Sequence, residues 1–157
     1  MAKIYGETDL LIAESIQAGV FSKLSPSDLV SVISACIYES RSDEGAKIPR
    51  GDVQMALAEV SKIYAKIHDA ESDMNLEPLR APDFGFCWAS QKWASGHSLT
   101  SILKGSDLTV GDFVRAIKQI IDLLRQLRSA APDLQQIIDQ SLKQIDRGVV
   151  AYAGAAV

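Results

Sequence analysis

The sequence predicts an all-α fold: a single bundle of about seven helices with one long central helix over residues 109–129. Apolar residues recur every three or four positions in nearly every segment, which is helical spacing. Helix start and stop signals divide the chain into pieces of helix length. The pattern indicates no β-strand. With 157 residues, 47% hydrophobic and 23% charged, the chain has the size and composition of one globular domain.

The first half of the chain predicts three helices. Thr8 is a suitable cap for a first helix that ends at Gly19. The run Ser25-Pro26-Ser27-Asp28 is a typical helix start, with Ser25 as the cap and Pro26 at the first helical position. Residues 41–51 are largely polar, contain Gly45 and Pro49, and are expected to form a loop. A long amphipathic helix should then run from Asp52 to about residue 75.

The second half predicts four more helices. Pro82 should start a helix rich in aromatic residues that ends near Gly96, and Ser98 should cap a short helix that stops at Gly105. Thr109, with Asp112 three residues later, resembles a capping box at the start of the long helix. Pro132 should begin a last helix whose apolar residues continue to Val150.

Charge is unevenly distributed along the chain. The net charge is −4, which argues against general binding of polyanions by the whole molecule. Residues 100–129 carry five basic and three acidic side chains and therefore a charge of +2, which leaves −6 for the remainder. The basic segment contains the long helix.

The long helix has two distinct faces. At 100° per residue, its polar side chains fall within an arc of about 140°. The members of this polar ridge are Asp112, Arg115, Lys118, Gln119, Asp122, Arg125, Gln126 and Ser129. Periodicity alone fits two interpretations: a solvated surface with Lys118 and Asp122 as an i,i+4 pair, or a ridge laid along a single nucleic-acid strand.

Other classes of function find little support in the sequence. The chain has no P-loop, no Gly-x-Gly-x-x-Gly motif and no nucleophile elbow, so we expect no catalytic residue. Cys36 and Cys87 are expected to be buried, reduced thiols. The chain has only two histidines, His68 and His97, so no metal site is expected. Neither a signal peptide nor a membrane span is evident, so we expect a cytoplasmic protein with no membrane partner.

Several runs together resemble a known family. They are Ile4-Tyr5-Gly6-Glu7-Thr8-Asp9-Leu10-Leu11, Leu24-Ser25-Pro26, Tyr38-Glu39-Ser40-Arg41, Trp93-Ala94-Ser95-Gly96, Asp107-Leu108-Thr109, Gly111-Asp112-Phe113-Val114-Arg115 and Arg147-Gly148-Val149-Val150-Ala151. In order and spacing they resemble the DSHCT domain, the C-terminal helical domain of DExH-box superfamily 2 helicases. The resemblance is closest to the HelY-like branch, which is related to the exosome-associated RNA helicases, and it spans nearly the whole chain.

This resemblance implies a function. In the family, the domain packs against two RecA-like motor domains, which bind ATP and Mg, and a ratchet helix faces the translocating strand. Residues 1–157 would then be one DSHCT-like domain, the C-terminal fragment of a larger ATP-dependent helicase, with no cofactor of its own. The ratchet helix corresponds to the long helix, so the implied nucleic-acid-binding residues are Arg115, Lys118, Gln119, Asp122 and Arg125, with Glu39 as a further candidate. The relationship favours RNA over DNA.

Two alternatives stay open. One is an all-α protein-interaction module that docks a partner through the aromatic helix, using Trp88 and Trp93, although tryptophans at this spacing are also typical of a core. The other is a helix-turn-helix DNA-binding regulator, because residues 98–119 have the rhythm of short helix, turn and second helix. Asp112 would lie where the second helix approaches phosphates, and Gly111 and Val110 offer little to the edge of a base, which weakens this alternative.

Overall fold

The computed structural model of the chain describes residues 9–38, 48–73, 81–104 and 108–155. Within these ranges all regular structure is helical, as predicted. The α-helices are α1 (Asp9–Gln17), α2 (Pro26–Ile37), α3 (Asp52–Asp73), α4 (Cys87–Ala94), α5 (Leu99–Leu103), α6 (Val110–Ala130), α7 (Gln135–Ile145) and α8 (Gly148–Ala155), and two short 3₁₀ helices are η2 (Phe84–Phe86) and η3 (Pro132–Leu134).

Three helices begin where the sequence predicts, for a local reason. Ser25, Ser98 and Thr109 each accept a hydrogen bond from a backbone N–H three residues later, at 3.3, 3.2 and 3.0 Å. Each cap satisfies an amide that the first turn leaves without an intrahelical partner. Thr8, the predicted cap of α1, lies outside the described residues.

The helix α2 forms the centre of the bundle. It packs against α3, α4, α6 and α7, and residues 29–36 are all buried. Its buried serines are satisfied: the Ser31 hydroxyl donates to the Cys87 carbonyl at 2.7 Å, and the Ser34 hydroxyl donates to the Ser31 carbonyl at 2.6 Å. Small side chains with internal partners let the backbones of α2 and α4 approach closely without the cost of an unpaired buried hydroxyl.

An aromatic cluster joins α4 to α6. The Phe113 ring lies 5.6 Å from that of Phe86 and 5.2 Å from that of Trp93, centroid to centroid. All three side chains are buried, and the indole N–H of Trp93 donates to the Ile145 carbonyl at 2.8 Å. The predicted aromatic helix begins as the 3₁₀ turn η2, capped by the Asp83 carboxylate on the Gly85 amide at 2.9 Å, and becomes α-helical only at Cys87.

The prediction of one continuous last helix is wrong. The segment divides into η3, α7 and α8, so the described residues contain eight α-helices rather than about seven. The chain turns at Asp146 and Arg147, and Gly148 has a φ of 55°, a left-handed value that favours glycine. Arg147 lies between the two helices, where its guanidinium donates to the carbonyls of Trp93 and His97, and these bonds favour the break.

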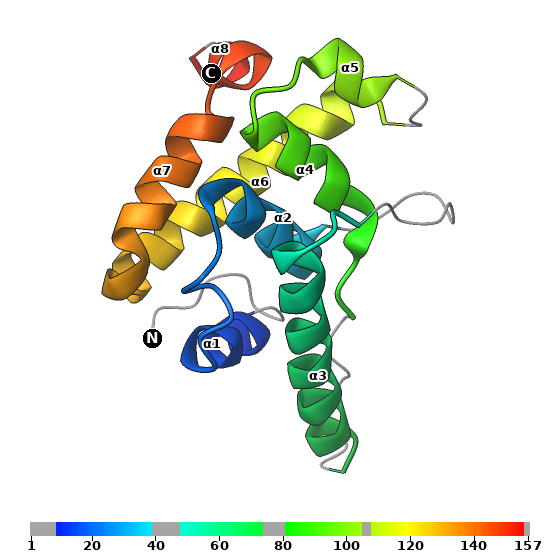
Figure 1. The fold of residues 1–157 in the computed structure, drawn as a ribbon, viewed down its shortest axis with the longest axis vertical. Helices are drawn as coiled ribbons and strands as arrows, with labels where there is room; N and C mark the ends of the chain where they lie inside the picture. The colour runs from blue at the N-terminus through cyan, green and yellow to red at the C-terminus, as the bar shows by residue number, and fades with distance from the viewer. Residues whose placement is uncertain (1–8, 39–47, 74–80, 105–107, 156–157) are drawn as a thin grey trace.

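Figure 1 shows how the elements are arranged. The helix α2 lies near the middle, α1 and α3 lie together at one end, and α5 and α8 lie at the other. The helix α6 runs behind α2 and α4 and meets α7 at the short η3 turn. None of the helices in the described ranges has the length and apolar character needed to cross a bilayer.

Candidate nucleic-acid interface

The ridge of α6 is held by the burial of its opposite face. Eight side chains of α6 are buried, among them Phe113, Ile117 and Leu124, each of which is 0% exposed. Burying a single large apolar side chain stabilises a fold by roughly 1.5–3 kcal/mol, so this face fixes the rotation of the helix about its axis. The polar ridge consequently lies on the outside of the bundle.

The structure places five of the six predicted residues on this one surface. Arg115, Gln119, Asp122 and Arg125 are exposed, and Lys118 is half-buried. Glu39, the sixth, lies outside the described residues.

Among the described residues, some charged side chains of α6 form ion pairs and others do not. Arg115 lies 4.0 Å from the Asp112 carboxylate, and Arg128 forms a closer pair with Asp139 of α7. In the part of the chain that the structure describes, Lys118 and Asp122 do not form the ion pair that their i,i+4 spacing allows. The middle of the ridge therefore presents its charges to solvent.

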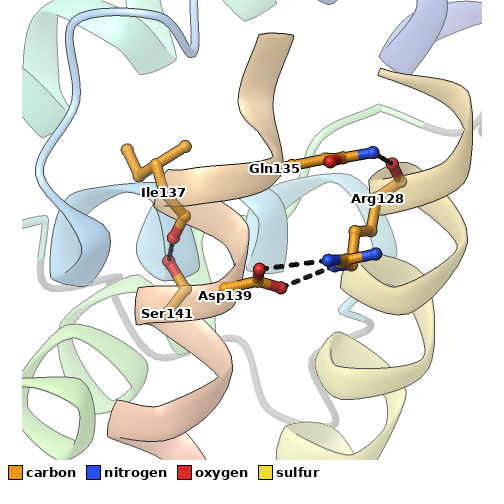
Figure 2. Close-up of polar contacts among 5 residues, drawn as sticks. All are labelled: Arg128, Gln135, Ile137, Asp139 and Ser141. Carbon is orange, nitrogen blue, oxygen red and sulfur yellow. Dashed lines mark hydrogen bonds and ion pairs between the residues drawn. The ribbon is translucent and has the colours of Figure 1, made fainter. Parts of the chain in front are cut away.

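The C-terminal end of α6 is tied to α7 (Figure 2). The Arg128 guanidinium donates to both carboxylate oxygens of Asp139, at 2.7 and 3.3 Å, and the Gln135 amide donates to the Arg128 carbonyl at 3.2 Å. On α7, the Ser141 hydroxyl donates to the Ile137 carbonyl at 2.8 Å and to the Pro26 carbonyl of α2 at 3.2 Å. These contacts fix α7 beside α6 and also against the centre of the bundle.

Other candidate groups have structural roles. Trp93 is buried at 2% exposure, so the interaction-module hypothesis retains only Trp88, which is half-buried with the Lys92 ammonium 6.0 Å from its ring. His97 is exposed, and its carbonyl accepts the hydrogen bond from Arg147. His68 stacks on Tyr64, with ring centroids 5.6 Å apart.

The two cysteines lie in the core, as expected. Burial raises the pKa of the Cys36 thiol to about 12 and that of the Cys87 thiol to about 11. Thiols with such pKa values are poor nucleophiles and poor metal ligands at neutral pH. Across the described ranges no group of three His, Cys, Asp or Glu side chains is arranged to hold a metal ion.

Comparison with known proteins settles the family. The DSHCT (NUC185) domain matches residues 1–153. The chain belongs to the DSHCT domain family. This confirms the resemblance inferred from the ordered sequence runs.

Several curated relatives of this DSHCT domain are named as helicases. The chain is 37% identical to "Probable helicase HelY" of Mycobacterium leprae over 96% of its length, and 25% identical to "ATP-dependent RNA helicase mtr4" of Schizosaccharomyces pombe over 92%. It is 23% identical to human "Exosome RNA helicase MTR4" over 96%. The chain spans only 18%, 14% and 15% of these relatives, so it corresponds to one part of much longer proteins.

Proposed function

We propose that this DSHCT domain guides single-stranded nucleic acid, RNA rather than DNA, through an ATP-dependent helicase of which it is the C-terminal part. The bundle packs on RecA-like motor domains of the same polypeptide, and α6 serves as the ratchet helix along the strand. The motor domains bind ATP and Mg, and they carry out ATP hydrolysis and unwinding. The domain works in the cytoplasm.

The observation that carries the proposal is the solvent-facing ridge of α6. An amphipathic helix of 21 residues, with its apolar face buried and its rotation fixed, presents Arg115, Lys118 and Arg125 at successive levels on the outside of the bundle. Guanidinium and ammonium groups bind phosphates, and amide side chains contact bases. The names of the HelY and Mtr4 relatives supply the helicase context, and the Mtr4 names favour RNA.

The test uses the helicase polypeptide that contains this domain. Replacing Arg115, Lys118 and Arg125 together with alanine should slow unwinding and reduce the stimulation of ATP hydrolysis by single-stranded RNA. The thermal midpoint of the domain should change little, because the three residues contribute no large apolar contact to the core.

A matched control removes the same charge elsewhere. Lys23, Lys62 and Lys66 are exposed and lie outside α6 and α7, so their replacement with alanine should leave unwinding unchanged. If the ridge variant unwinds RNA and responds to strand as the unsubstituted helicase does, the proposal fails. An equal loss in both variants would point to overall charge rather than to the ridge.

A further inference from the structure

The ridge of α6 has two chemically different edges. At 100° per residue, Lys118 and Arg125 lie about 20° apart on one edge, and Gln119 and Gln126 lie about 20° apart on the other. The centres of the two edges are about 100° apart around the axis. We call the first pair the cationic edge and the second pair the amide edge. The exposed Asp122 lies between them.

The cationic edge carries the uncompensated positive charge of the helix. Arg115 has the Asp112 carboxylate beside it, whereas within the described ranges neither Lys118 nor Arg125 takes part in an ion pair. The electrostatic attraction of α6 for a phosphate is therefore strongest at this edge. Between the two edges lie Asp122, whose carboxylate repels phosphates, and Arg115, whose charge is partly compensated by Asp112. This further separates the two edges.

The cationic edge lies beside α7 at its Arg125 end. Arg128, which reaches across to Asp139, lies only about 60° around the helix from Arg125. The short η3 turn reverses the chain between the two helices, as Figure 1 shows, so one turn backward along α6 corresponds to one turn forward along α7. Arg125 precedes Arg128 by one turn and Lys143 follows Asp139 by one turn, which places Arg125 and Lys143 at the same level.

Two further observations support a positive boundary here. Arg128 holds the pKa of the Asp139 carboxyl below its usual range, chiefly through their hydrogen bond, so Asp139 is an anion already neutralised by its partner. Lys143 is exposed, and it also lowers the pKa of Asp139, which indicates that its ammonium is close to this boundary. The next acidic residue along the chain, Asp146, lies beyond the end of α7 and so is not part of this boundary.

We propose that α7 is part of the strand-binding surface: the sugar–phosphate backbone of a single strand follows the cationic edge of α6 from Lys118 to the boundary with α7, where Arg125 and Lys143 hold it. The bases turn toward Gln119 and Gln126 on the amide edge. The inference rests on the proposed function and assigns each side of the ridge a separate task. The Arg128–Asp139 pair holds α6 and α7 at a fixed position relative to each other beneath the sugar–phosphate backbone of the strand.

Salt dependence separates phosphate contacts from base contacts. The probe is a fluorescein-labelled single-stranded oligouridylate, and its binding to the 157-residue chain is followed by fluorescence anisotropy over a series of salt concentrations. For a single strand, each lost phosphate contact reduces the log–log slope of affinity against salt by about 0.7. Lys143→Ala and Arg125→Ala should each show this reduction, and the double variant should lose about twice as much.

The amide edge and a distant lysine provide the controls. Gln119→Ala with Gln126→Ala should weaken binding while leaving the slope unchanged, because an amide releases no counterion. Lys66→Ala, on α3 and exposed, should alter neither affinity nor slope.

The possible results are distinguishable. If Lys118→Ala and Arg125→Ala reduce the slope but Lys143→Ala does not, the role of α7 is refuted and the proposed function stands. A reduced slope in the glutamine variant would overturn the assignment of the two edges. Absence of salt-dependent binding by the unsubstituted chain, or equal slopes in all variants, would refute both this inference and the proposed function.

Discussion

Arg147 should contribute more to stability than an arginine near the end of a helical bundle normally does. A single terminal nitrogen of its guanidinium donates to the Trp93 carbonyl at 2.7 Å and to the His97 carbonyl at 2.8 Å. The guanidinium carbon also lies 3.7 Å from the centroid of the Trp93 ring. These contacts cap the C-terminal end of α4 and hold the start of α8 against it. We expect Arg147→Ala to destabilise the whole bundle.

The magnitude follows from the contacts. A hydrogen bond from a charged donor contributes about 1.5–3 kcal/mol, and because the contact with His97 is solvent-exposed the two bonds together belong near the lower end, about 1.5–2 kcal/mol. The stacked cation adds about 0.5–1 kcal/mol at a site of this exposure. Loss of both should lower the free energy of unfolding by about 2–3 kcal/mol, a large share of the roughly 5–15 kcal/mol available to a domain.

Urea unfolding followed by far-ultraviolet circular dichroism measures the change, and tryptophan fluorescence reports on the indole ring itself. Arg147→Lys keeps the charge but loses the flat stacking geometry, so it should recover less than half of the lost stability. Arg50→Ala is the matched control, since Arg50 is exposed, and its effect should stay within about 0.5 kcal/mol. A stability of Arg147→Ala within about 0.5 kcal/mol of the unsubstituted protein would refute the argument.

Three further predictions follow from the geometry. Gly148→Ala should lower stability by about 1–2 kcal/mol in urea unfolding, because the residue has a φ of 55° and a Cβ would lie 3.3 Å from the Trp93 ring, whereas Gly111→Ala, in open helical surroundings, should not destabilise. Cys36 and Cys87 should not react with a thiol reagent in the native state and should react once urea unfolds the chain. Their folded pKa values of about 12 and 11 exceed the ordinary 9.0, so as the pH rises above 9.0 the thiols ionise in the unfolded chain before they do so in the folded one. The free energy of unfolding should therefore fall above pH 9.0, and a rise would count against buried thiols. Asp139→Asn should lower stability modestly at neutral pH and weaken its dependence on acid. A carboxyl whose folded pKa lies below 3.8 stabilises the fold above that pH and loses this contribution as the pH falls, and asparagine cannot supply it. An unchanged acid profile would contradict the pairing with Arg128.

Helix starts and faces could be predicted because they depend on local chemistry. Ser25, Ser98 and Thr109 cap helices through bonds that span three residues, and no distant contact is needed to form them. The exposed side of α6 also followed from the sequence, because one helix can bury only its apolar stripe. The family could also be recognised from the sequence, because the order and spacing of its runs are properties of the chain itself.

The end of the chain was harder to predict. The apolar spacing continues through Val150, so periodicity favours one helix after Pro132. The structure breaks it at Asp146, because Arg147 finds the carbonyl and the indole ring of Trp93 on α4 and the carbonyl of His97 just after it, about fifty residues away in the sequence. Trp88 and Trp93 show the same limit, since both fit a core or a surface and only the packing of α4 buries Trp93.

For the ridge, the sequence by itself determined which side chains share one face of α6 and that this face is the polar one. Only the tertiary structure decided what lies beside it: the pairing of Arg128 with Asp139 sets α7 against the edge that carries Lys118 and Arg125. Helical periodicity fixes angles around one axis, because successive residues are covalently linked. The position of a second axis depends on contacts between residues distant in sequence, and those form only when the bundle packs.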